Sequence, residues 1–142
     1  MDKQNDILKI DLQGMAPLIQ VFDMPTSLKF YRDILGFKVV QSSGEGDDVD
    51  WVLLELNKIE LMLNTAYEKE HRPANPDQLR IAAHADTTLY FGCPDIDAAY
   101  KCLHNSGVDL KEPSITGYGW KAINFKDPDG FEICFHWPEG EN

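Results

Sequence analysis

Residues 22–37, with the sequence FDMPTSLKFYRDILGF, contain both ends of one helix. Asp23 is a residue type that caps helix N-termini, and Pro25 suits the first turn. Apolar residues then recur at helical spacing until Gly36, which has the residue type that commonly ends helices. The stretch therefore predicts a helix between Asp23 and Gly36.

The same pattern returns in the second half of the chain, where Asp95 and Gly107 bracket a second apolar stretch. Asp95 follows Asp23 by 72 residues and Gly107 follows Gly36 by 71. Runs typical of strands surround each helix. We predict strands over residues 17–22, 36–43, 51–56 and 59–64, and again over 87–93, 108–110, 120–126 and 131–137.

The repeated order predicts an α+β protein built from two tandem βαβββ modules. Residues 15–64 form the first module and residues 86–138 the second, within a single domain covering 1–142. Residues 65–85 carry prolines and charges without a clear period, so we expect a connector with at most one short helical turn. Asn57-Lys58 and Asp127-Pro128-Asp129-Gly130 are expected to be turns without chemistry, and His84 to be an exposed loop residue.

Composition limits the partners that we expect. The net charge of −11 repels phosphates, so nucleic acid is not an expected partner. No apolar run is long enough to span a membrane, and residues 1–9 do not resemble a signal peptide. Three cysteines without a CxxC pair argue against a disulfide framework and favour the cytoplasm.

Alternation along the strands predicts which side chains face the interior between the two sheets. Apolar members of this inner set favour an enclosed cavity over an open groove, and Tyr118 lies in a glycine-flanked loop that could act as a lid. Ordinary packing in the core or at the rim is equally compatible with these residues. The expected ligand-binding residues are Gln20, Trp51, Met62, Thr88, Tyr90, Tyr118, Trp120, Cys134 and His136.

Two segments resemble the vicinal oxygen chelate superfamily, which includes glyoxalase I, extradiol dioxygenases and bleomycin-resistance proteins. They are SLKFYRDILGF at 27–37 and FKDPDGFEI at 125–133. The resemblance covers about residues 15–138 and implies a glyoxalase/bleomycin-resistance-type incomplete barrel. It also implies a homodimer, since many relatives form sites at paired modules.

The resemblance implies four metal-ligand positions in the metal-dependent members, and three have changed in this chain. Ala16 and Thr88 stand where those members place ligands at the two first strands, and Cys134 stands in place of a glutamate. Only Glu60, in Ile59-Glu60-Leu61, keeps the ligand type. Because one carboxylate and one thiol are a poor set for a divalent ion, we expect no metal and no cofactor.

Glu60 is the one candidate for catalysis, as a general base with a pKa that burial would raise. The simpler interpretation is a carboxylate that is hydrogen-bonded across the sheet. Cys134 would be a nucleophile only if a base such as His136 activated it, and an inert buried thiol is the simpler reading.

The leading hypothesis is a metal-independent protein that sequesters a small organic ligand, aromatic or cationic, in the cavity between the sheets. The alternative is a metal-dependent lyase, isomerase or dioxygenase with a displaced site using Glu60, Glu132, Cys134 or His136. A subunit or sensor domain with an empty pocket is the third hypothesis.

Overall fold

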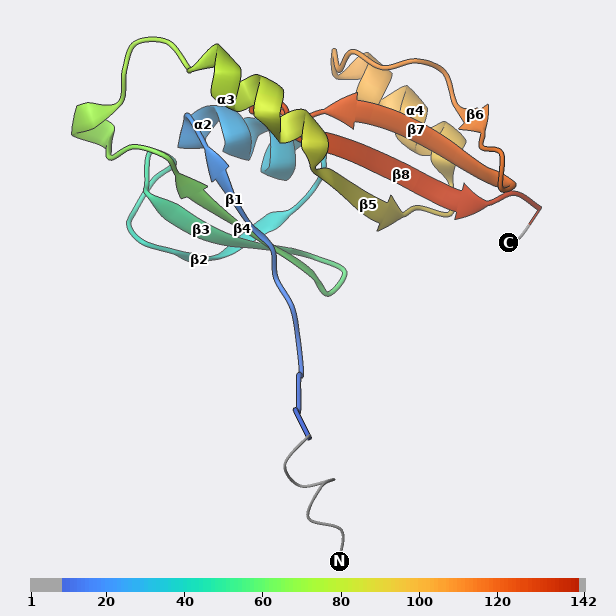
Figure 1. Ribbon diagram of the computed structural model, residues 1–142, viewed down its shortest axis with the longest axis horizontal. Coiled ribbons are helices and arrows are strands. Elements are labelled where there is room, and N and C mark those ends of the chain that lie inside the picture. The colour runs from blue at the N-terminus through green and yellow to red at the C-terminus, as the bar shows by residue number, and fades with distance from the viewer. Residues whose placement is uncertain (1–8, 141–142) are drawn as a thin grey trace, which may run out of the picture.

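The computed structural model describes residues 9–140, which form two mixed sheets with helices on one side (Figure 1). The first half contains β1 (Leu18–Val21), α2 (Met24–Leu28), the π-helical η1 (Lys29–Ile34), β2 (Lys38–Ser42), β3 (Trp51–Leu56) and β4 (Ile59–Thr65). The linking segment contains η2 (Lys69–His71), α3 (Gln78–Ala83) and η3 (His84–Asp86). The second half contains β5 (Thr88–Gly92), α4 (Ile96–Asn105), β6 (Ser114–Ile115), β7 (Trp120–Lys126) and β8 (Glu132–Pro138).

The strand order is the same in both sheets, which confirms the predicted α+β fold with two βαβββ modules and no closed barrel. The orders are β1-β4-β3-β2 and β5-β8-β7-β6. In each sheet the first strand pairs in parallel with the last, and the remaining pairs are antiparallel. A parallel pair needs a crossover connection, and in each module a helix supplies part of it.

The first helix begins where its sequence predicts. The Asp23 carboxylate accepts a hydrogen bond from the Thr26 backbone N–H, and Pro25 lies in the first turn. The later part is wound as a π-helix, with the Leu35 N–H donating to the carbonyl of Phe30. Both Phe30 and Tyr31 are buried, although they are neighbours in sequence.

One predicted strand is wrong. Residues 108–110 form no strand; β6 lies at Ser114–Ile115 instead. After Gly107, which has a φ of +86°, the Val108 N–H donates to the Leu103 carbonyl and completes the end of α4. Val108 and Leu110 pack against the core. Their apolar character, which suggested a strand, therefore reflects packing of an irregular segment.

The connector is also more helical than expected, because Asp77 caps α3 by accepting a hydrogen bond from the Leu79 N–H. Its two flanking 3-10 turns add further ordered structure between the two halves.

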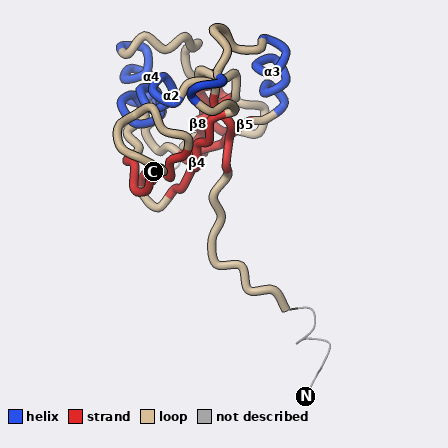
Figure 2. Tube along the Cα trace, turned by 90° about the vertical axis from the view of Figure 1, so that its left-hand side faces the viewer, coloured by secondary structure: helices blue, strands red, loops and turns tan. Residues whose placement is uncertain are grey.

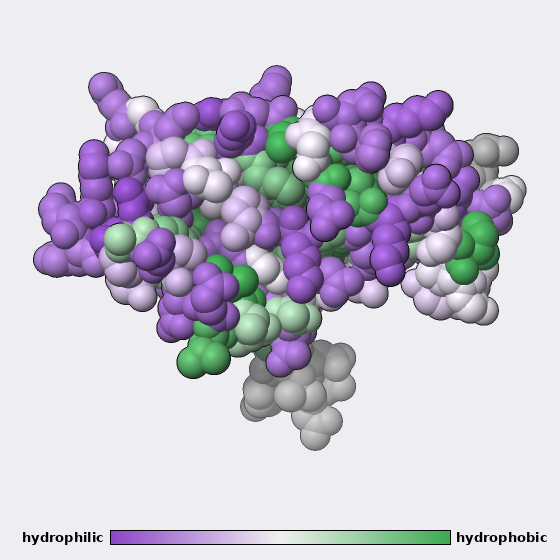
Figure 3. All heavy atoms as spheres, turned by 90° about the horizontal axis from the view of Figure 1, so that it is seen from above, coloured by the Kyte–Doolittle hydropathy of each residue, from purple (hydrophilic) through white to green (hydrophobic). Residues whose placement is uncertain are grey.

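The core lies between the sheets and the helices. In two views at right angles, α2, α3 and α4 lie on the same side of the strands (Figures 1 and 2). In each sheet, every second side chain along the strands points toward the helices. Several of these side chains are fully buried, including Val21, Leu63 and Ile133. The surface on the helix side is largely hydrophilic, with smaller apolar groups in its middle and near its edges (Figure 3). We call the opposite side of the two sheets the open face.

Candidate functional site

The open face of the first sheet carries rows of side chains set by the strand register. Gln20 lies opposite Asn64, which in turn lies opposite Trp51. The neighbouring row contains Met62 between two leucines. Because residues directly opposite each other share a sheet face, the register brings Gln20, Trp51 and Met62 onto one surface.

Four aromatic side chains gather on the open face of the second sheet. The ring centroids of Tyr90 and His136 lie 5.0 Å apart, and those of Trp120 and His136 lie 4.5 Å apart. The ring of Tyr118 adds to this group at 6.3 Å from Trp120. We call these four residues the aromatic cluster. Rings at such distances form a continuous surface suited to a planar or cationic group.

The aromatic cluster is open rather than enclosed. Tyr90 is 59% exposed and Tyr118 is 63% exposed, and Leu18 on the first sheet is 47% exposed. The expectation of an enclosed cavity therefore fails for the single chain at these positions. Residues of the aromatic cluster line neither of the two cavities of about 500 and 780 Å³.

Tyr118 lies at a tight turn rather than in a loose loop. The Thr116 N–H donates to the Trp120 carbonyl, and the Gly119 N–H donates to the Thr116 carbonyl. The Glu139 N–H also donates to the carbonyl of Gly119. Opening this turn as a lid would break these hydrogen bonds, so the turn holds Tyr118 beside Trp120.

His136 carries an unsatisfied polar atom. Its Nδ1 is buried and has no hydrogen-bond partner within the described residues. Its ring lies between those of Tyr90 and Trp120, which offer it no hydrogen bond. A buried polar atom without a hydrogen-bond partner lowers the stability of the fold. A hydrogen bond to this nitrogen, from a shifted Tyr90 or from a bound group, would therefore be favourable.

Cys134 lies between Tyr90 and Asn124 in the register of the second sheet. Only 2% of the residue is exposed. Burial raises the pKa of its thiol, and the nearby charge of Glu132 raises it further. The thiol therefore stays protonated at neutral pH, which disfavours the nucleophile hypothesis.

Glu60 lies opposite Glu55 across β3 and β4 and is only half-buried. Thr88 lies opposite Glu132 at the start of β5. The structure thus places Glu60 and Thr88 on different sheets.

The donors at the four family positions do not fit a metal ion. Ala16 has no donor side chain, and no group of three or more His, Cys, Asp or Glu residues within residues 9–140 could hold one. The displaced site fares no better, because Glu132 accepts a hydrogen bond from Asn124 and Cys134 is buried. Structural and catalytic metal centres need about three or four close ligands.

The Asp127–Gly130 turn has a structural role that its sequence did not predict. The Phe22 N–H donates to Asp129 Oδ1 over 2.7 Å, and Arg80 pairs with the same carboxylate at 3.3 Å. Asp129 is almost fully buried. Its contacts connect the second module, to which it belongs, with the first module and the connector. No signal beyond the DPDG pattern would have identified this role.

The expectation that His84 is an exposed loop residue is wrong. Its ring stacks on Phe131 with centroids 3.9 Å apart, and its Nδ1 lies 2.7 Å from the carbonyl oxygen of Asp129. His84 is partly buried, and both contacts hold the connector against the same turn.

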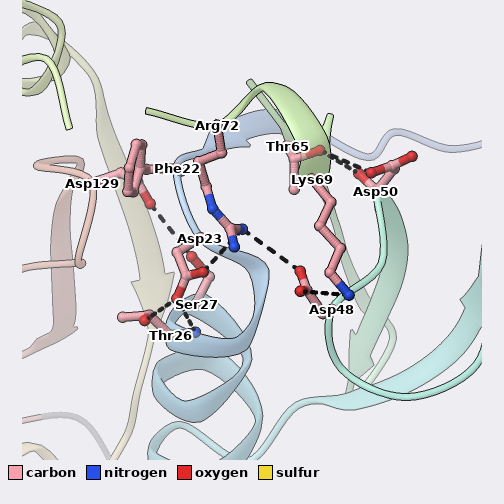
Figure 4. A network of polar contacts seen from close by, with 10 residues as sticks. All are labelled: Phe22, Asp23, Thr26, Ser27, Asp48, Asp50, Thr65, Lys69, Arg72 and Asp129. Atoms are coloured by element: carbon pink, nitrogen blue, oxygen red, sulfur yellow. Dashed lines mark hydrogen bonds and ion pairs between the residues drawn. The ribbon is translucent and has the colours of Figure 1, made fainter. Parts of the chain in front are cut away.

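A cavity of about 500 Å³ lies beside the start of α2. Figure 4 shows Arg72 of the connector between two carboxylates, at 3.0 Å from Asp23 and 3.6 Å from Asp48. Lys69 pairs with Asp48 as well. Since both cations already face carboxylates, this network fastens the connector to the first module.

The second cavity, of about 780 Å³, lies along β7 beyond the short pairing with β6. It is bounded by β7 on one side and by the segment after α4 on the other.

Comparison with known proteins agrees with this architecture. A lactoylglutathione lyase of Haemophilus influenzae is 29% identical over 135 residues, covering 87% of this chain and 91% of the relative. The bleomycin resistance determinant encoded on transposon Tn5 superposes with a TM-score of 0.66 at 18% identity, covering 90% of this chain and 99% of that one. A glyoxalase/bleomycin resistance protein/dioxygenase from Nocardioides gives 0.71 at 18% identity, with 99% and 93% covered.

None of the helices in the described part has the length and apolar character needed to span a lipid bilayer.

The family model of the Glyoxalase/Bleomycin resistance protein/Dioxygenase superfamily matches residues 14–135. This match covers most of the chain and agrees with the two-module fold described above. The chain therefore belongs to the glyoxalase/bleomycin resistance protein/dioxygenase superfamily.

Proposed function

We propose that the chain binds a small organic molecule without a metal ion, through the aromatic cluster on the open face. The observation that carries this proposal is the contact of Tyr90, Trp120 and His136, with Tyr118 beside them. Exposed rings offer stacking and cation–π contacts, so a planar aromatic cation is the ligand class best matched to them. The net charge of −11 also favours a cation over an anion.

The first sheet contributes the remaining expected ligand contacts, Gln20, Trp51 and Met62. The proposal includes a homodimer, in which a second copy covers the open face that one chain leaves exposed. It also includes a cytoplasmic location, which the free state of all three cysteines supports.

Ligand titrations followed by tryptophan fluorescence test the proposal. The probes are ethidium as a planar cation, bleomycin, and S-lactoylglutathione. We expect ethidium or bleomycin to bind, and Tyr90→Ala and Tyr118→Ala each to weaken binding about 3- to 30-fold. Leu79→Ala is the matched control, since Leu79 is 82% exposed on α3, on the helix side.

Two results would contradict the proposal. Binding that is unchanged in both tyrosine variants would place the ligand elsewhere. A stoichiometric metal ion in protein purified without chelators, together with turnover of S-lactoylglutathione that a chelator abolishes, would favour the metal-dependent lyase. Glu60→Gln would then remove that turnover.

A further inference from the structure

One buried nitrogen in the aromatic cluster has no partner in the described chain. Within residues 9–140, the buried side-chain nitrogens without a hydrogen-bond partner are His136 Nδ1 and Trp137 Nε1. Trp137 packs against the core, and alternation along β8 places His136 on the other face, beside Tyr90. Of these two nitrogens, only His136 Nδ1 therefore belongs to the surface that we propose binds a ligand.

The register of the second sheet explains why this nitrogen is left alone. His136 lies opposite Gly92 on β5 and opposite Ala122 on β7. Neither neighbour has a polar side chain, and the rings of Tyr90 and Trp120 contact the imidazole without a hydrogen bond. Apart from a rotation of Tyr90, a hydrogen bond to Nδ1 has to come from outside the described residues.

The chemistry of imidazole indicates which kind of group suits this nitrogen. A neutral imidazole carries one proton, so one ring nitrogen donates and the other accepts. An N–H group buried without an acceptor is rarer in proteins than an acceptor buried without a donor. We therefore assign the proton of His136 to Nε2, which leaves Nδ1 as the acceptor. The matching group on a ligand is a hydrogen-bond donor.

The two rings beside His136 differ in how firmly they are held. The backbone of Trp120 is fixed at the turn, because its N–H donates to Thr116 Oγ1 over 3.0 Å and its carbonyl accepts from the Thr116 N–H over 2.7 Å. Tyr90 is 59% exposed, so a change of its rotamer breaks few contacts. Tyr90 can therefore swing aside and open the way to Nδ1, while Trp120 stays in place to support a planar ligand.

We propose that the ligand of the aromatic cluster carries an N–H donor at the edge of its planar ring, and that this donor pairs with His136 Nδ1. A planar molecule on the same face of Trp120 as His136 meets the imidazole edge to edge, and the Nδ1 lone pair lies in that plane. The displaced Tyr90 ring then covers the other face of the ligand. The ligand class is an amino-substituted planar aromatic cation. This inference rests on the proposed function and adds the group that selects among planar cations.

The pairing acts on selectivity. Stacking on the rings of the cluster is available to any planar cation, with or without a donor. A cation without a donor leaves Nδ1 buried and unpartnered beneath it, so the cost of desolvating that nitrogen stays uncompensated. Sites that hydrogen-bond a ligand group discriminate against analogues that lack the group.

A pair of phenothiazinium dyes with the same ring system and the same charge tests the proposal. Thionin carries amino groups, whereas methylene blue has a methyl group in place of every amino hydrogen. Equilibrium dialysis, with dye absorbance as the readout, measures both dissociation constants for wild-type protein and for His136→Phe. The phenylalanine keeps an aromatic ring and removes the nitrogens. We expect His136→Phe to weaken thionin binding about 3- to 10-fold and to change methylene blue binding less than about twofold.

The matched control is His104→Phe, at an exposed histidine on α4. It should leave the binding of both dyes unchanged. His136→Phe should keep or raise the midpoint of thermal denaturation, because it removes a buried nitrogen without a partner. Misfolding would therefore show in the same protein sample and cannot be mistaken for a lost hydrogen bond.

NMR of nitrogen-labelled protein reports the hydrogen bond directly. The Nδ1 resonance of His136 is identified by its absence in His136→Phe. We expect it to shift upfield when thionin is added and to shift far less with methylene blue.

The dye measurements also distinguish the failure of this inference from the failure of the proposed function. If Tyr118→Ala weakens the binding of both dyes but His136→Phe leaves their ratio unchanged, the proposed function stands and this inference is overturned. Equal weakening of both dyes by His136→Phe would overturn it as well, since the change of ring would then be the cause. If neither dye binds, or if Tyr118→Ala affects neither, the proposed function fails and this inference fails with it.

Discussion

The phenol oxygen of Tyr31 lies 2.5 Å from a carboxylate oxygen of Asp127, and this hydrogen bond joins the two halves of the chain. Tyr31 comes from η1 of the first module, and Asp127 follows β7 of the second. The other Asp127 oxygen accepts hydrogen bonds from the backbone N–H groups of Asp129 and Phe131, each at 2.9 Å. One carboxylate therefore shapes its own turn and attaches it to the opposite module.

Tyr31→Phe should lower the free energy of unfolding by about 1–3 kcal/mol at neutral pH, because it leaves a buried carboxylate oxygen without its donor. Burial and the charge of Asp127 raise the pKa of the Tyr31 phenol. The stabilisation is thus complete below the ordinary tyrosine pKa of about 10 and is lost as the pH rises toward the folded-state value. Urea denaturation should show the wild-type advantage narrowing above about pH 10.

The control is Tyr118→Phe, at an exposed hydroxyl. It should change the stability by less than about 0.5 kcal/mol. An equal loss in both variants would show that the bond to Asp127 contributes nothing specific.

Asp127→Asn should reveal an unusual pH dependence. Burial raises the pKa of the Asp127 carboxyl above its ordinary value of 3.8, and the charge of Asp129 acts in the same direction. A raised carboxyl pKa means that the stability contribution is complete below about pH 3.8 and falls as the pH rises through the folded-state pKa. In urea denaturation from pH 3.5 to 7, the difference between wild type and Asp127→Asn should be largest at the acid end. A difference that grows with pH would contradict the direction of this shift.

Gly130→Ala should destabilise the protein by about 3 kcal/mol. Gly130 has a φ of +88°, and an added Cβ would lie 2.5 Å from the backbone oxygen of Ile81. The new methyl group would therefore combine backbone strain with a clash against α3. Gly107→Ala is the matched control, because Gly107 has a φ of +86° with nothing within 4 Å of the added atom.

The control variant should lose only about 1 kcal/mol, from backbone strain alone. Thermal denaturation of both variants measures the difference between them. Equal losses would show that α3 moves aside without cost.

The three thiols should react at different rates with an aromatic disulfide reagent at pH 8. Cys102 is exposed, whereas burial raises the pKa of both the Cys93 and the Cys134 thiol. We expect Cys134 to react at least about tenfold more slowly than Cys102 until urea unfolds the chain. Cys102→Ser should remove the fast phase. A fast phase that persists in this variant would show that a second thiol is activated.

The sequence predicts most of the fold because local signals and the global pattern agree. Asn57 and Lys58 both have positive φ, as a tight hairpin with a two-residue turn requires, and the strands on either side lie as predicted. The segment at 108–110 failed because apolar residues pack equally well in a strand and in an irregular segment. Its conformation depends on contacts with the core, which spacing along the chain does not show.

The candidate site was only partly predictable. Strand alternation brings Tyr90 and His136 together, since both lie on the open face of adjacent strands. Strand alternation does not predict how exposed the side chains of the open face are. Their exposure depends on how the two sheets are placed relative to each other. The roles of Asp129 and His84 were missed for the same reason, since their partners lie far away in the sequence.

The position of Asp129 has a consequence for how such a protein can change over time. Its contacts are with the backbone N–H of Phe22 and the guanidinium of Arg80, so they do not involve the side chains that the open face displays. Residues such as Gln20, Trp51 and Tyr90 can then be exchanged at small cost in folding. A lineage built on this frame can acquire new ligand preferences one surface substitution at a time, without first gaining spare stability.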